Sequence, residues 1–320
     1  YNMTGGILSA GGDQSTGGDT CCAGIIVGDA GTGTFNQIGG SVTTGIAGTQ
    51  RADLLIGAQA GSTGTYNLGD STNAAPTLTV NGDAILGRDA AGGFALVTNQ
   101  EGATIDTVPL GAANGTLAIS GNGTSMSVDQ YTGFDSHNGG NLIVGSSGVG
   151  AVTQTDQSTV YTDHNLVLGA NAGSSGTYTL NATSITSGAN SNDNLFVGSD
   201  LNIGGMTSQT DEYNDNFQTT ANGGTGTFNL QSGDAATAGA VNVGNNDGVG
   251  NLNVSGGTLS AGNGMNVGIN DGNAGGSGGG QGTVTQTGGS VTVGDINDSR
   301  ALNLGVTAVD SDTTTGTYNI

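Results

Sequence analysis

The chain has 320 residues, of which 65 are Gly and only 2 are Pro, and its formal net charge is −22 with just three basic side chains. Nucleic acids and anionic membranes attract proteins through Lys and Arg, so this charge balance argues against both as partners. The sequence contains no run of 18 apolar residues, and we therefore expect no membrane insertion through a spanning helix.

A short apolar segment that ends in Gly recurs along the whole chain. Its members are Val27-Gly28, Ile56-Gly57, Leu86-Gly87, Leu110-Gly111, Val144-Gly145, Leu168-Gly169, Val197-Gly198, Val243-Gly244, Val267-Gly268 and Leu304-Gly305. Internal repeats of this kind are typical of solenoids, which grow along one axis without enlarging their core. The markers predict about ten coils in a single domain over residues 1–320.

Each unit also holds segments in which apolar residues alternate with Thr, Ser or Asn. Successive side chains of a strand point to opposite faces, so the alternating residues define an inner and an outer face. A first strand places two residues inward at Tyr1/Met3, Phe35/Gln37, Tyr66/Leu68, Phe94/Leu96, Leu117/Ile119, Val152/Gln154, Tyr178/Leu180, Phe228/Leu230, Leu252/Val254, Val284/Gln286 and Tyr318/Ile320. A second strand does so at Leu8/Ala10, Val42/Thr44, Leu78/Val80, Met126/Val128, Val160/Thr162, Ile185/Ser187, Leu259/Ala261 and Val291/Val293.

These three strands per unit predict an all-β fold. We expect a right-handed parallel β-solenoid (a β-helix) of triangular section, with corner loops of variable length. The longest loop insertions are expected near residues 129–140 and 205–224, which are rich in the turn-forming residues Gly, Asn and Asp.

The repeated units GTYN-L, GG-S/T-L/V and N-L-x-V-G resemble the repeats of bacterial autotransporter-type and related secreted surface β-solenoid proteins. The resemblance covers nearly the whole chain and implies an extracellular or cell-surface location with a structural or matrix role. It transfers no catalytic residue to this sequence.

The middle residue of the third strand should point outward, and in the first six units that we counted this way it is apolar. We call this set the apolar stripe: Ile26, Leu55, Ile85, Ile143, Val167 and Phe196. A large exposed apolar surface usually marks an interface, so the stripe predicts lateral packing against another copy of the chain. The alternative is that the chain's own loops cover this face. In the later coils Asn242, Asn266 and Asn303 take the same position and predict a ladder of side-chain amides.

The sequence shows no capping element at either end of the repeat. Tyr1 begins within a first strand, and Tyr318 and Ile320 lie in another. Unpaired strand edges are templates for further strands, so we expect head-to-tail stacking of copies into a homopolymer. The alternative is that the chain is a window of a longer repeat protein.

Cys21 and Cys22 are adjacent and are the only cysteines. They predict a disulfide, either between the two neighbours or to other subunits, with free thiols as the third possibility.

We expect no cofactor, except that calcium is possible in the acidic corner loops. Those loops hold Asp13, Asp19, Asp211, Asp215, Asp247, Asp271, Asp295, Asp298, Asp310 and Asp312. No other metal ligand set is apparent, since His137 and His164 lack ligand spacing.

We expect no enzymatic activity, because acids and basic residues are not grouped as β-helix hydrolases require. The sequence favours a structural subunit of an extracellular filament or surface matrix. The alternative is a cell-surface adhesin or a rod that binds glycans.

Overall fold

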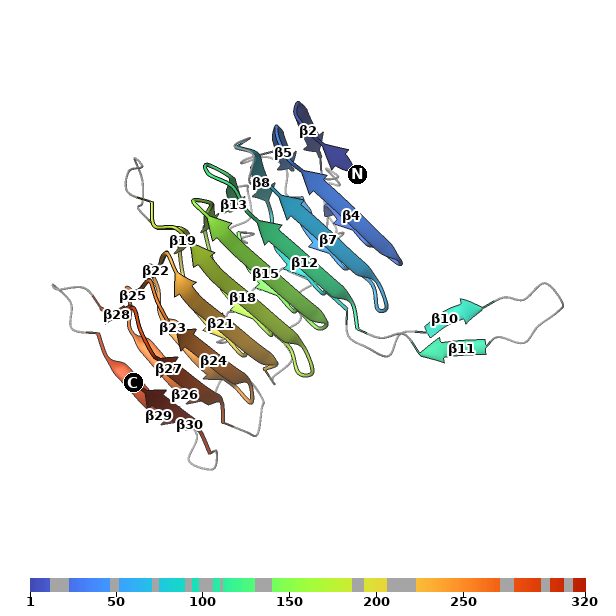
Figure 1. Ribbon diagram of the computed structural model, residues 1–320. Coiled ribbons are helices and arrows are strands. Elements are labelled where there is room, and N and C mark those ends of the chain that lie inside the picture. The colour runs from blue at the N-terminus through green and yellow to red at the C-terminus, as the bar shows by residue number, and fades with distance from the viewer. Residues whose placement is uncertain are drawn as a thin grey trace.

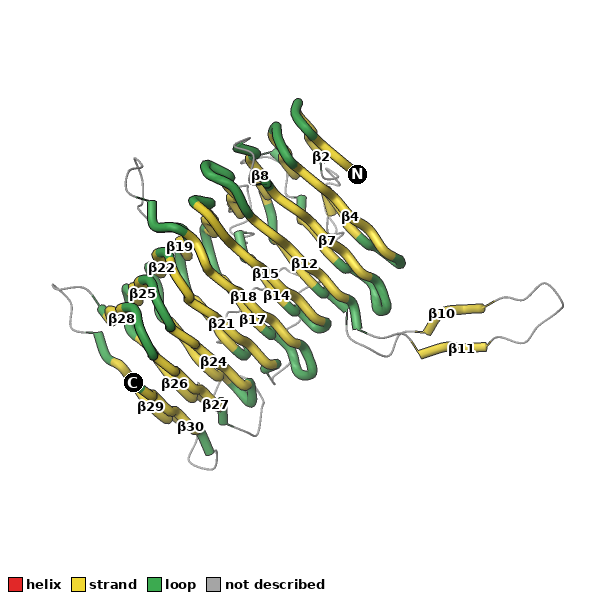
Figure 2. Tube along the Cα trace, viewed as in Figure 1, coloured by secondary structure: helices red, strands yellow, loops and turns green. Residues whose placement is uncertain are grey.

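The computed structural model describes residues 1–11, 23–46, 52–70, 75–89, 94–97, 106–109, 112–129, 140–185, 193–205, 223–270, 279–294, 300–307 and 313–320. Every regular element in these ranges is a β-strand, which confirms the all-β prediction. The strands stack along one axis (Figures 1 and 2).

The first sheet has ten strands, and all of its neighbours are parallel. In spatial order they are β1 (Asn2–Met3), β4 (Thr32–Gln37), β7 (Thr63–Leu68), β12 (Asn114–Ile119), β15 (Val149–Asp156), β18 (Ser175–Ala182), β21 (Thr225–Ser232), β24 (Val249–Val254), β27 (Gln281–Gln286) and β30 (Thr315–Asn319).

The second and third sheets have nine strands each. The second runs β2 (Ile7–Ala10), β5 (Ser41–Thr44), β8 (Thr77–Asn81), β13 (Ser125–Asp129), β16 (Thr159–Thr162), β19 (Leu195–Val197), β22 (Asp234–Thr237), β25 (Thr258–Ala261) and β28 (Ser290–Val293). The third runs β3 (Ala23–Val27), β6 (Asp53–Ile56), β9 (Ala84–Leu86), β14 (Leu142–Val144), β17 (Leu166–Leu168), β20 (Leu201–Ile203), β23 (Val241–Asn245), β26 (Met265–Asn270) and β29 (Leu302–Thr307).

The chain visits the three sheets in turn, so three successive strands make one coil. The predicted parallel β-solenoid is therefore confirmed, with nine complete coils followed by β30 as a tenth first-sheet strand. The core is one hydrophobic column between the sheets. In β7 and β21, for example, exposed and buried residues alternate, and Tyr66, Leu68, Phe228 and Leu230 are all fully buried.

A close contact between coils explains why Gly follows the third strand. Gly57 has a φ of +70°, and a Cβ atom on it would lie 2.1 Å from the carbonyl oxygen of Asn114 in the next coil. Only Gly adopts this conformation without strain and leaves room for the neighbouring backbone. The glycines after most other third strands repeat this geometry.

Two of the sequence markers were wrong. Val197 ends β19, which pairs with β16 and β22 in the second sheet, so it does not end a third strand. The third strand of that coil is β20, and its Gly204 has the expected φ of +75°, whereas Gly198 has no positive φ. Ile185, expected in the second strand of the same coil, lies outside any strand, and Ser187 falls outside the described residues.

The second wrong marker lies in an insertion between β9 and β12. Phe94 and Leu96 belong to β10 (Phe94–Val97), which forms an antiparallel pair with β11 (Asp106–Pro109) and joins none of the three sheets. Figure 1 shows this hairpin standing away from the coils. Leu110-Gly111 falls outside the described residues. The two expected insertions, residues 129–140 and 205–224, lie between β13 and β14 and between β20 and β21, and are largely outside the described ranges.

Candidate functional site

The apolar stripe lies mostly on the outer side of the third sheet, but it is not exposed. Leu55, Ile85, Ile143 and Val167 are each at most 5% exposed, and they form a hydrophobic cluster separate from the core. The prediction of an exposed stripe was therefore wrong for these four, because they are already buried within one chain. Ile26, at the N-terminal end of the row, is 44% exposed.

Phe196 is not part of that row. Because β19 belongs to the second sheet, Phe196 lies opposite Tyr161 of β16 and not beside Val167. The two rings are stacked, with centroids 5.5 Å apart and planes 5° from parallel. Tyr161 is 39% exposed and its hydroxyl donates a hydrogen bond to Asp163. The result is an aromatic pair on the outer face of the second sheet.

The predicted ladder of amides is confirmed and is one coil longer than expected. The Nδ2 atoms of Asn242, Asn266 and Asn303 donate to the Oδ1 atoms of Asn202, Asn242 and Asn266 at 3.0, 2.8 and 2.8 Å. Asn202 and Asn242 are buried. We call Asn202, Asn242, Asn266 and Asn303 the amide ladder, and it ties four successive third-sheet strands together.

A second ladder, which we did not predict, lies at the corner just before the third strand. Its members are Asp53, Asp83, Asn141, Asn165 and Asp200, and we call it the corner ladder. The Oδ1 atom of each accepts the backbone N–H of the residue at the same place in the next coil, at 2.7 to 3.1 Å. The sequence signal was an Asp or Asn directly before an apolar third strand.

Inside the ladder, the amides of the two Asn residues also donate along the axis. Asn141 Nδ2 donates to Asp83 Oδ1, and Asn165 Nδ2 donates to Asn141 Oδ1, both at 3.1 Å. Asp53, Asp83, Asn141 and Asn165 are all buried. A buried carboxylate is costly unless hydrogen bonds satisfy it, and here two donors from Asn141 converge on Asp83.

A third device, also missed, consists of buried pairs in the first sheet. The hydroxyls of Tyr66, Tyr178 and Tyr318 donate to the Oε1 atoms of Gln37, Gln154 and Gln286 in the preceding coil, at 2.7, 2.6 and 2.7 Å. We call these the Gln–Tyr pairs. In the first two pairs all four residues are fully buried. The Gln residues had been read only as inward positions of the repeat.

Burial raises the pKa of Tyr66 and of Tyr178 above the usual value of about 10. Above that pH the unfolded chain loses these protons while the folded chain keeps them, so folding stability should fall as pH rises. Each Tyr should contribute a slope of about 1.4 kcal/mol per pH unit. Chemical denaturation at several pH values above 10 measures this slope, which should be shallower in Tyr178→Phe. Tyrosinate absorbance from every Tyr in the folded protein near pH 10 would contradict the prediction.

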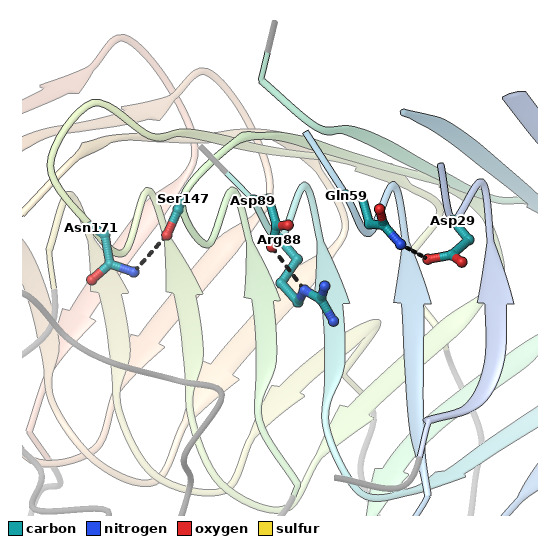
Figure 3. Close-up of polar contacts among 6 residues, drawn as sticks. All are labelled: Asp29, Gln59, Arg88, Asp89, Ser147 and Asn171. Carbon is teal, nitrogen blue, oxygen red and sulfur yellow. Dashed lines mark hydrogen bonds and ion pairs between the residues drawn. The ribbon is translucent and has the colours of Figure 1, made fainter. Parts of the chain in front are cut away.

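Polar side chains also bridge coils along the corner between the third and first sheets (Figure 3). Gln59 Nε2 donates to Asp29 Oδ1 at 3.0 Å, and Asn171 Nδ2 donates to Ser147 Oγ at 3.1 Å. Between them in the row, Arg88 Nε lies 2.9 Å from Oδ1 of the adjacent Asp89. The chain thus has axial polar contacts at several positions around its circumference.

The two end coils place the remaining predicted interface residues. Tyr1 is 69% exposed and stacks on Phe35 with a centroid distance of 4.9 Å. Tyr318 packs partly against the core, whereas Ile320 is fully exposed. At the same end, Leu302 and Leu304 of β29 occupy inward positions but are 45% and 48% exposed.

Several expectations fall wholly or partly outside the described residues. Cys21, Cys22 and His137 lie there, as does every Asp of the expected calcium loops except Asp247. Within the described ranges, no three His, Cys, Asp or Glu side chains gather in a metal-binding group. The same ranges contain no helix long and apolar enough to cross a membrane.

The described strands and ladders define the chain as a parallel β-solenoid whose coils are linked by side-chain hydrogen bonds. No family model, curated protein or solved structure matches it.

Proposed function

We propose that the chain is a structural subunit of an extracellular filament or surface matrix, in which copies join head to tail. The observation that supports this proposal most directly is the set of axial ladders. They supplement the backbone pairing of successive coils with buried side-chain hydrogen bonds at the corner and on the third sheet. Such cross-links favour a stiff rod over a flexible linker.

The exposed end coils support joining at the ends. Leu302 and Leu304 would be covered by another coil stacked on β29, as Met265 and Val267 of the coil before are covered by β29 itself. Burial of apolar surface is worth about 25 cal/mol per Å², so these residues favour association at this end. The buried part of the apolar stripe is not included in the proposal.

Sedimentation and electron microscopy of the purified full chain test this function. One rod of nine strand spacings should be about 43 Å long, at roughly 4.8 Å per spacing. End-to-end multimers whose lengths are multiples of this unit are expected as concentration rises. Single rods at every concentration would contradict the head-to-tail proposal. Antibody labelling of intact cells tests location, and labelling only after permeabilisation would contradict an extracellular role.

A glycan-binding rod is the second candidate, and the aromatic pair Tyr161–Phe196 is the observation that favours it. Sugar rings stack on aromatic side chains, and here Ala236, opposite Phe196 in the next coil, leaves the end of the stack beside a small side chain. A polysaccharide panel in affinity electrophoresis tests this. Retardation that is lost in Tyr161→Ser but kept in the matched second-sheet variant Thr79→Ser would support it, and no retardation would contradict it.

A further inference from the structure

The first sheet follows a matching rule from coil to coil. It has nine steps between neighbouring strands, and in three of them the earlier strand carries an inward Gln. Each of these three Gln residues is followed by a Tyr in the next coil, in the Gln–Tyr pairs. In the other six steps both inward residues are apolar: Met3 and Phe35, Leu68 and Leu117, Ile119 and Val152, Leu180 and Phe228, Leu230 and Leu252, and Val254 and Val284.

The rule has a physical cause. A buried Tyr hydroxyl without a partner costs about 1–3 kcal/mol, so Tyr is favoured where the preceding coil supplies an acceptor. Gln in turn needs that donor for its oxygen, because its Nε2 is used elsewhere. In Gln154, for example, Nε2 donates to the carbonyls of Ser158 and Asn194. The inward residues of neighbouring coils are therefore matched chemically as well as by size.

Tyr1 is the one remaining Tyr at this position. The pairing of Asn2 with Asn36 and of Met3 with Gln37 puts Tyr1 opposite Phe35, in the register that Tyr66, Tyr178 and Tyr318 occupy. By the matching rule, the strand that best fits the open edge of β1 carries Gln at the inward position after its own apolar residue. Ile320, opposite Gln286 in register, occupies that position in β30 and supplies no acceptor.

Direct stacking of β1 on β30 would also leave levels unfilled. The first sheet ends with β30, but the described second and third sheets end one level earlier, with β28 and β29. If β1 of a second copy paired with β30, then β2 and β3 would lie two spacings from β28 and β29, about 9.6 Å, which is too far for backbone hydrogen bonds.

Both mismatches disappear if β1 pairs with β27 in place of β30. Gln286 of β27 then faces Tyr1, and the three strands β1, β2 and β3 meet β27, β28 and β29 at one level. Tyr1-Asn2 repeats Tyr318-Asn319, so the incoming residues are the same as those they replace. The exchange gives up one paired strand and gains three.

We propose, building on the head-to-tail function above, that copies of this chain join by strand replacement. β1 of one copy displaces β30 of another and takes its place on β27, so that Tyr1 donates to Gln286. β30 therefore acts as a competitor that covers the joining edge, and the joined rod has no missing strand at the junction. The partner at this surface is a second copy of the same chain.

Two full-length variants test the competition, and both keep every strand. Tyr318→Phe removes the hydroxyl that holds β30 on Gln286, so association should strengthen. Tyr1→Phe removes the incoming hydroxyl, so association should weaken. Each change should shift the association constant about fivefold, the equivalent of one neutral hydrogen bond, in opposite directions. Equal shifts, or no shift in either, measured by analytical ultracentrifugation would overturn the proposal.

A third variant removes residues 313–320 and so exposes β27. Its association should exceed that of the full chain, and adding Gln286→Leu should reverse the gain. Circular dichroism melting confirms that each variant is folded, and the full-length pair still decides the proposal if the shortened chain is not. Multimers of the full chain that ignore both Tyr changes would leave the filament function standing and overturn strand replacement. Single rods of the full chain with multimers of the shortened chain would do the reverse.

Discussion

Replacement of Asn141 by Asp should destabilise the folded chain by about 3–5 kcal/mol at pH 7, the range found when a buried charge loses its compensation. Asn141 Nδ2 donates to the buried Asp83 Oδ1, and the substitution would put a second carboxylate against the first. It would also remove one of the two donors that converge on Asp83. Chemical denaturation of variant and wild type at pH 7 measures the difference.

The pH dependence of that difference identifies its cause. Like charges raise the folded-state pKa of the new carboxyl above its unfolded value, so the penalty is present at neutral pH and shrinks as pH falls through the raised pKa. The matched control is Asn141→Ala, which loses the same hydrogen bonds without adding charge. Its cost, about 1–3 kcal/mol, should change little between pH 7 and pH 4. An Asp variant whose penalty is as large at pH 4 as at pH 7 would contradict the charge argument.

Gln154→Leu should cost about 2–4 kcal/mol, because it orphans a buried hydroxyl and removes two further donors. Tyr178 is fully buried and its hydroxyl donates to Gln154 Oε1 at 2.6 Å. The two carbonyls that Gln154 serves keep other partners: Asn194 Nδ2 also donates to Ser158, and Val160 N donates to Asn194. The hydroxyl of Tyr178 is therefore the main unsatisfied group.

A double-mutant cycle isolates this effect. Adding Tyr178→Phe to Gln154→Leu removes the orphan and should restore about 1–2 kcal/mol, a coupling typical of residues in direct contact. The reciprocal control uses an apolar step: Phe228→Tyr alone should destabilise, because Leu180 in the preceding coil offers no acceptor. Adding Leu180→Gln should then recover part of the loss. Strict additivity in either cycle would show that the pairs are not matched.

The coil architecture could be predicted because each of its signals is local. The alternation in Tyr66-Asn67-Leu68 and the Gly after Ile56 follow from strand geometry and from the close approach of the next coil. Val197-Gly198 mimicked that signal, and only its pairing with Thr162 shows that it belongs to another sheet. A two-residue marker does not record which neighbour a strand meets.

The burial of the apolar stripe could not be predicted for a different reason. Ile85 and Ile143 are outward residues of their strands, and their cover depends on segments distant in sequence. The corner ladder and the Gln–Tyr pairs were accessible in principle. Each is a residue type that recurs at one position of the repeat, but its role appears only when neighbouring coils are compared, as with Gln37 and Tyr66.

The side-chain amides give the rod a chemical direction. In the amide ladder, each Nδ2 donates to the coil on its N-terminal side. Asn36, Asn67 and Asn253 on the first sheet do the same, as do Asn141 and Asn165 at the corner. Aligned amides make the N-terminal tip a face of donors and the C-terminal tip a face of acceptors. Two like tips therefore cannot satisfy each other, and any assembly built through them is polar, with two tips that grow at different rates.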